Sequence, residues 1–161
     1  MKQETERQLA ERLVSDYSDM ILRLGYSILN SVQDAQDICQ EVLLKRMAFA
    51  ETFPTSAQER AWMVRVTVNA CKNLRRSFWR RHTVGLDQAA EQPVFQPEPD
   101  GVLEQVQQLP VRDREVLVLY YYMGYHTEEI AGLLGVRPEA VRARMSRARR
   151  RLKAELEVQE I

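Results

Sequence analysis

Apolar side chains recur every three or four residues along most of the chain, the spacing that places them on one face of an α-helix. Over the first half this pattern predicts a charged helical segment at 4–15 and helices at about 16–29, 33–50 and 60–80. A polar loop at 52–59 is expected before the last of these. The positions expected to be buried are Tyr17, Ile21, Leu24 and Ile28, then Trp62, Val64, Val66, Val68, Ala70 and Cys71.

The helical pattern returns after residue 100, with a short helix expected at 102–107 and a strongly apolar one at 112–123. Thr127 can cap a short third helix, and Gly135 best turns the chain after its end. Pro138 suits the first position of the next helix. The apolar positions of that helix are Val141, Met145, Ala148 and Leu152. Two helices joined by a glycine turn predict a helix-turn-helix.

Between these two periodic stretches the pattern disappears. Residues 85–99 contain three prolines and three acidic side chains without helical spacing, which is typical of a flexible linker. The sequence therefore predicts an all-α protein of two small helical domains, the second of which contains the helix-turn-helix. We expect the domains at 1–82 and 101–161, with the linker at 83–100.

Charge is segregated along the chain, although 23 basic and 23 acidic residues give a net charge of zero. Residues 142–153 hold seven basic side chains and no acidic one. A helix with an apolar back and a basic front suits the major groove of DNA, because clustered positive charge attracts phosphates. The alternative interpretation is a solvated helix face whose cations complement the helix dipole.

Several classes of protein receive no support from the residues. No apolar run approaches the roughly 18 residues of a membrane-spanning helix, and no signal peptide opens the chain. Cys39 and Cys71 lack metal-ligand spacing and are expected to be buried thiols of a cytoplasmic protein. His82 and His126 are isolated, and neither a phosphate-binding glycine loop nor a zinc-protease motif occurs. We therefore expect no catalytic residue, no metal, no cofactor and no enzymatic activity.

The helix at 33–50 has an acidic face, which we define as Asp34, Asp37, Gln40 and Glu41. The three carboxylates stack on one side, where like charges cost a helix a few tenths of a kcal/mol per pair. The dipole favours Asp34 near the helix start, and Lys45 partly offsets Glu41. A solvated acidic face and a docking surface for a basic partner helix both remain open at this point.

The helix at 60–80 carries a polar stripe, which we define by the five residues Arg65, Asn69, Lys72, Asn73 and Arg76. Beyond it, residues 75–82 set Phe78 and Trp79 among basic side chains. Arginines can hold phosphates and aromatic rings can stack on exposed bases, so this region suits a nucleic-acid strand. Alternatively, one or both rings complete the apolar core of the first domain.

Four segments in this order resemble bacterial sigma factors of the sigma-70 superfamily, of the small extracytoplasmic-function (ECF) type. In chain order they are residues 34–41, residues 60–81, the group Leu109, Pro110, Arg112, Arg114 and Glu115, and residues 127–152. The resemblance covers nearly the whole chain and implies a subunit that binds core RNA polymerase, directs it to promoters and helps to open the DNA. It also implies contacts with the beta-prime clamp helices and the beta flap, and an anti-sigma factor, often membrane-bound.

The resemblance further implies a role for each surface. The acidic face would dock on core polymerase, and the polar stripe would bind the minus-ten element, with Asn69 and the loop at 52–59 holding a flipped base. The residues implied for minus-thirty-five binding are Glu139, Arg142, Ala143, Arg144, Ser146 and Arg147. Two positions depart from the family pattern, since Asn73 replaces a common aspartate and Glu139 a common glycine. These departures affect the promoter sequence that would be read.

Two other functions are considered. A helix-turn-helix regulator that binds duplex DNA on its own would explain residues 127–156, but it assigns no role to the acidic face or the polar stripe. An all-α interaction protein with solvated arginines would explain the composition alone. Affinity for duplex DNA without polymerase would favour the first, and unchanged function after replacing Arg142 and Arg147 together would favour the second.

Overall fold

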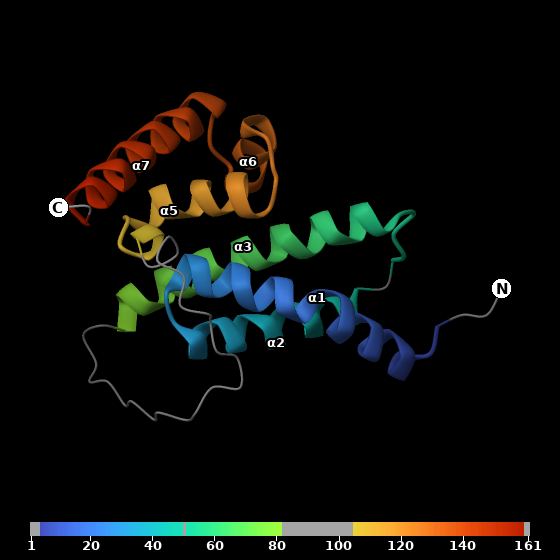
Figure 1. Cartoon of the computed structure of the whole chain (residues 1–161). Helices are drawn as coiled ribbons and strands as arrows, with labels where there is room; N and C mark the ends of the chain where they lie inside the picture. Colours follow the sequence, from blue (N-terminus) through green and yellow to red (C-terminus); the bar gives the residue numbers. More distant parts are fainter. Residues whose placement is uncertain (1–3, 50, 82–104, 160–161) are drawn as a thin grey trace. The chain divides into compact units, whose positions relative to one another are not determined.

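The computed structural model describes residues 4–49, 51–81 and 105–159, and their regular structure is helical throughout (Figure 1). The predicted all-α class is therefore confirmed for this part of the chain. Contacts divide the protein into two compact units, Met1–Gln96 and Pro97–Ile161. The predicted linker at 83–100 lies outside the described residues, as do the side chains of Phe78 and Trp79.

The first unit begins with α1, Glu6–Leu29, one continuous helix that contains most of the charged helical segment predicted at 4–15 and the helix predicted at 16–29. Its start is fixed by a capping box, in which the Gln8 amide donates to the Thr5 hydroxyl and the Thr5 amide donates to the Gln8 side chain. Asn30 ends the helix in the left-handed conformation, with φ 55°. Ser31 then caps α2, Val32–Ala48, by accepting a hydrogen bond from the amide of Asp34.

The third helix, α3, spans Ser56–Arg81 and begins earlier than predicted. The Thr55 hydroxyl accepts a hydrogen bond from the Gln58 amide at 3.2 Å, which satisfies one of the free donors at a helix start. The predicted loop at 52–59 is therefore wrong in its second half. Glu59 lies in the first turn of α3 and is buried.

Apolar side chains of all three helices form the core of the first unit. Two sets of predicted residues are buried: Tyr17, Ile21, Leu24 and Ile28 on α1, and Val64, Val68, Ala70 and Cys71 on α3. Leu13, Val42 and Met63 join them. Trp62 and Val66 were predicted to be buried but are only half-buried, at the edge of the core. Cys39 is a free thiol whose Sγ donates to the Ser18 carbonyl at 3.8 Å; burial raises its pKa to about 11, so it remains protonated near neutral pH.

The second unit contains α5, Val111–Leu117, the π-helical turn η1, Val118–Tyr122, then α6, Thr127–Leu134, and α7, Pro138–Gln159. Residues 105–107 are helical, while the rest of the predicted helix at 102–107 lies outside the described residues. The helix predicted at 112–123 forms as α5 followed directly by η1, so its C-terminal part is π-helical, and Tyr121 and Tyr122 on η1 are exposed. The buried Arg114 donates to the carbonyls of Gln107 and Leu109 and so connects α5 to the segment before it.

The helix-turn-helix forms from α6 and α7. Gly135 adopts the left-handed conformation with φ 68°, as its predicted turn role requires, and Pro138 is the first residue of α7. The start of α6 differs from the prediction, because His126 is the N-cap and Thr127 is already helical. The Glu129 carboxylate accepts the His126 amide hydrogen at 3.0 Å, so this acidic side chain caps the helix in place of Thr127.

Candidate polymerase and promoter interface

The acidic face lies on the side of α2 that is turned away from the core. Asp37, Gln40 and Glu41 are exposed and Asp34 is half-buried, while Ala35, Ile38, Cys39 and Val42 of the same helix are buried. Partial burial raises the pKa of Asp34 and the charge of Asp37 raises it further, against a lowering by the hydrogen bond with Ser31. Asp37 therefore repels the charge of Asp34, and a cationic partner would relieve that repulsion.

An exposed leucine extends the acidic face. Leu44 lies three residues after Glu41 and seven after Asp37, so it shares their side of α2, and it is 58% exposed. Lys45, one helical turn after Glu41, pairs with it; Nζ of Lys45 lies 3.5 Å from Oε2 of Glu41. Leu44 therefore adds apolar contact area beside the carboxylates.

The polar stripe occupies the exposed side of α3. Arg65, Asn69, Asn73 and Arg76 are exposed and Lys72 is half-buried. The opposite side of the helix packs into the core through Val64, Val68 and Cys71. The five residues therefore lie along one accessible surface, with donors that can reach phosphates and base edges.

Three rings form an aromatic cluster at the beginning of this surface, composed of Phe49, Phe53 and Trp62. The ring centroids are 5.6 Å apart for Phe49 and Phe53, 5.2 Å for Phe49 and Trp62, and 5.9 Å for Phe53 and Trp62. All three side chains are half-buried. Trp62 precedes Asn69 by two helical turns on the same side of α3, so the cluster and the polar stripe are adjacent. Sequence reasoning missed the cluster, because Phe49 lies at the end of the helix predicted at 33–50 and Phe53 in the predicted loop, and helical spacing does not bring residues of these two segments together.

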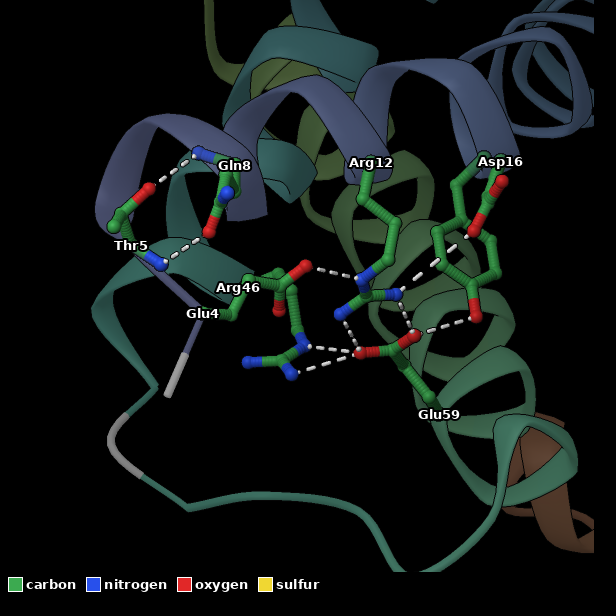
Figure 2. A network of polar contacts seen from close by, with 8 residues as sticks. Glu4, Thr5, Gln8, Arg12, Asp16, Arg46 and Glu59 are labelled. Atoms are coloured by element: carbon green, nitrogen blue, oxygen red, sulfur yellow. Dashed lines mark hydrogen bonds and ion pairs between the residues drawn. The ribbon is translucent and has the colours of Figure 1, made fainter. Parts of the chain in front are cut away.

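A buried ion-pair network lies beside the aromatic cluster and contains Arg12, Tyr17, Arg46 and Glu59; we call it the Glu59 network. Figure 2 shows Arg12 and Arg46 reaching the Glu59 carboxylate from two sides. Arg12 donates to its two oxygens at 2.7 and 3.1 Å, Arg46 donates twice to Oε2 at 3.0 and 2.8 Å, and the Tyr17 hydroxyl donates to Oε1 at 2.7 Å. The network joins α1, α2 and α3.

The network strongly favours an ionised Glu59. Its hydrogen bonds, first those from Arg12 and then those from Tyr17 and Arg46, lower the pKa of Glu59 to about 2 against an opposing effect of burial. Burial and the hydrogen bond to Glu59 raise the pKa of Tyr17 to about 12. The guanidinium of Arg46 also lies 4.9 Å from the centroid of the Phe53 ring, so it contacts both the carboxylate and the aromatic cluster.

The exposed side of α7 presents its basic residues together with the predicted base-reading positions. Among the predicted site residues, Glu139, Arg142, Ala143, Ser146 and Arg147 are exposed and Arg144 is half-buried. Val141, Met145 and Ala148 face the core of the second unit. Arg142 makes long, exposed ion pairs with Glu128 at 3.8 Å and Glu139 at 3.6 Å, contacts that a DNA phosphate can replace at little cost.

Asp113 on α5 supports two arginines of α7, a role that the sequence did not reveal. Its carboxylate lies 3.4 Å from Nη2 of Arg147 and 4.0 Å from Nη1 of Arg151, and its side chain is only 5% exposed. A third arginine, Arg149, donates to the Tyr121 hydroxyl at 2.9 Å and lies over that ring. A DNA phosphate would therefore compete with Asp113 for Arg147 and Arg151.

No group of three or more histidine, cysteine, aspartate or glutamate side chains in the described part of the chain could hold a metal ion. None of the helices in the same residues combines the length and apolarity needed to cross a membrane.

The fold and its exposed surfaces define the class first: an all-helical protein with a basic helix-turn-helix suited to DNA. Comparison with protein families then narrows the class. Residues 13–81 match the family model for sigma-70 region 2, and residues 100–152 match the model for sigma-70 region 4. The chain therefore belongs to the sigma-70 family, in its extracytoplasmic-function group.

Relatives agree with this assignment. The chain is 30% identical over 163 positions to a probable RNA polymerase sigma factor, RfaY, of Xanthomonas campestris, a match over 93% of this chain and 41% of that protein. The chain thus spans less than half the length of this relative. It is 28% identical to the ECF sigma factor SigL of Mycobacterium tuberculosis over 94% of this chain and 91% of SigL.

Among solved structures, the fold resembles the sigma factor RpoE of Bartonella quintana, which was determined in complex with the anti-sigma factor NepR. The TM-score is 0.71 and the sequence identity 22%, over 92% of this chain and 96% of that one. At this identity the match concerns the fold alone.

Proposed function

We propose that this protein is an ECF-type sigma factor that binds core RNA polymerase, directs it to specific promoters and promotes DNA opening. The observation that carries the proposal is the presence of both sigma-70 regions in one chain, with three chemically different surfaces exposed on α2, α3 and α7. The proposed role requires binding and positioning by these surfaces and no reaction catalysed by the chain itself. It also places the protein in the cytoplasm, where bacterial transcription takes place.

We assign core polymerase binding to the acidic face together with Leu44. Exposed carboxylates at Asp37 and Glu41 suit a basic partner helix, because complementary charge accelerates association and suppresses wrong partners. The partner proposed for this face is the pair of beta-prime clamp helices, and the beta flap is proposed for the second domain. Both assignments rest on the family resemblance.

We assign the minus-ten element to the polar stripe and the minus-thirty-five element to α7. The stripe suits a separated strand because its donors lie next to the aromatic cluster, on which bases can stack. On α7, side chains near the helix start, such as Arg142 and Ser146, are placed to read base edges, because a recognition helix contacts bases with its first turns. Arg149 and Arg150, further along, fit phosphate contacts that position the helix without reading sequence.

We also propose an anti-sigma factor as a regulatory partner. The support is the resemblance of the fold to RpoE, which was solved with the anti-sigma factor NepR. Whether this partner is membrane-bound, as the sequence resemblance suggested, is part of the same proposal.

The test is run-off transcription from fragmented genomic DNA with bacterial core polymerase, with and without this chain, followed by sequencing of the transcripts. We expect new, discrete start sites that share two spaced upstream elements. The absence of new starts together with the absence of core binding would contradict the proposal. Tight binding to duplex DNA without polymerase would then favour a helix-turn-helix regulator.

A charge-reversal pair tests the docking surface within the same assay. Asp37→Arg with Glu41→Arg should weaken core binding, because both side chains are exposed on the acidic face. The matched control is Glu6→Arg with Glu11→Arg, which makes the same charge change on the exposed side of α1. Equal core affinity for the two double variants would remove the docking role of the acidic face.

A further inference from the structure

We propose that Glu59 is a positioning residue for promoter opening: it holds Arg46 against Phe53 and thereby keeps the aromatic cluster in place beside the polar stripe. The inference rests on the proposed function, and it assigns a task to a buried carboxylate that does not touch the DNA.

The Glu59 carboxylate is saturated with donors. It accepts five hydrogen bonds from three side chains on α1 and α2, and its own side chain is 6% exposed. A buried charge with this many partners cannot rotate without leaving several of them unpaired. Glu59 therefore fixes the position of every group that contacts it.

Arg46 transmits this constraint to the aromatic cluster. Its guanidinium donates through Nε and Nη2 to Glu59, which fixes the plane of the group, and lies 4.9 Å from the Phe53 ring centroid. A planar guanidinium can satisfy a carboxylate along its edge and stack on a ring with its face at the same time. Phe53 belongs to the non-helical segment between α2 and α3, so this contact ties the segment to the core.

The cluster that is held in this way borders the proposed DNA surface. Phe53 and Trp62 are half-buried, so part of each ring remains accessible. Asn69 lies about 10 Å further along the same side of α3, from the 1.5 Å rise per residue. Rings stack on any base and side-chain amides hydrogen-bond to base edges, so the cluster and the stripe together can receive a separated strand.

Stability alone does not account for a buried network of this kind. Replacing a buried ion pair by apolar residues of similar volume is often neutral or stabilising, because desolvating the charges costs about as much as their attraction returns. An apolar pair at positions 46 and 59 could close the core, but it would not hold a planar cation against Phe53. The network is explained by the geometry that it imposes on the aromatic cluster.

The experiment measures how polymerase loaded with this chain binds a fluorescein-labelled single strand, the non-template minus-ten region of a promoter mapped by run-off transcription. The test variant is Arg46→Lys, which keeps a cation beside Glu59 but removes the planar group that reaches Phe53. We expect affinity for the single strand to fall about tenfold, the equivalent of one lost base-stacking contact. Binding to core and to the duplex minus-thirty-five fragment should not change.

Two further variants separate positioning from general destabilisation. Glu59→Gln should weaken single-strand binding as well, and combining it with Arg46→Lys should add little, because both changes break the same contact. The control is Ile28→Val, which loosens the buried core of the same unit away from the network. Unfolding of each variant by urea is measured in parallel.

The results discriminate clearly. If Arg46→Lys weakens single-strand binding no more than Ile28→Val does, the positioning role is refuted while the proposed function stands. If no promoter can be mapped because the chain directs no transcription, the proposed function fails, and this inference with it.

Discussion

Replacing Glu59 by glutamine should destabilise the first unit far more than an exposed glutamate would. The change keeps the size of the side chain but removes the charge that Arg12 and Arg46 share. The glutamine amide offers one acceptor oxygen, whereas both oxygens of the glutamate carboxylate accept hydrogen bonds. Arg46, whose side chain is 6% exposed, is then left in the core without a counter-charge.

The expected magnitude follows from the pKa of Glu59. Its displacement from 4.5 to about 2 corresponds to about 3 kcal/mol in favour of the ionised, folded form at neutral pH. An independent comparison is the cost of breaking a buried ion pair by removing one partner, which is also about 3–5 kcal/mol. The folded-state pKa lies below the unfolded one, so this stabilisation is present above about pH 5 and is lost as the pH falls from 4.5 towards 2.

Urea unfolding followed by tryptophan fluorescence measures the effect, because Trp62 and Trp79 are the only tryptophans and both belong to the first predicted domain. At pH 7 we expect the midpoint of Glu59→Gln to fall by about 1–3 M urea. The control is Glu11→Gln, which breaks a pair with Arg7 in which both side chains are largely exposed, and it should change stability by less than about 0.5 kcal/mol.

The pH dependence provides the decisive comparison. Glutamine does not titrate, so the difference in urea midpoint between the wild type and Glu59→Gln should narrow steadily as the pH is lowered from 5 towards 2. Equal midpoints at pH 7, or a gap that is the same at pH 7 and at pH 3, would refute the reasoning.

Two predictions concern the second unit. Asp113→Asn removes the carboxylate beside Arg147 and Arg151, so both arginines become more available to DNA phosphates. Duplex binding measured by fluorescence anisotropy should therefore tighten, and the slope of log Kd against log salt should steepen by about one to two. An unchanged slope would contradict the prediction that Asp113 competes with phosphates for these arginines. Gly135→Ala should destabilise the second unit by about 1 kcal/mol in thermal unfolding, because alanine is strained at a φ of 68°. An added Cβ would meet no atom within 4 Å, so the cost comes from the backbone conformation and not from a steric clash. Gly132→Ala, at an equally open helical position, should instead stabilise it, and similar shifts for both glycines would contradict the argument.

The features that could be predicted from the sequence are those that local physics determines. Burial of Ile21 and Leu24 follows from helical spacing, and the turn between α6 and α7 follows from the conformational freedom of Gly135 and the fixed φ of Pro138. The placement of the acidic face, the polar stripe and the basic residues of α7 on exposed surfaces follows from the same periodicity. Their roles in binding remain proposals.

The features that could not be predicted depend on contacts between distant residues. The sequence analysis placed Glu59 in a polar loop at 52–59, whereas it lies in the first turn of α3. Its burial depends on Arg12, 47 positions earlier, and on Arg46, 13 positions earlier. The pairing of Asp113 could not be predicted either, since its partner Arg147 lies 34 residues away. Neither pairing leaves a periodic signal.

The order of residues in the Glu59 network bears on how a newly made chain reaches its native state. Arg12 and Arg46 leave the ribosome before Glu59 does, so α1 and α2 can bring their apolar faces together while Arg46 still lacks its counter-charge. The first two helices are therefore an incomplete folding unit. Synthesis of α3 supplies both the counter-charge of Glu59 and the apolar side chains of Met63, Val64 and Val68, so the nascent domain can close only once α3 is made.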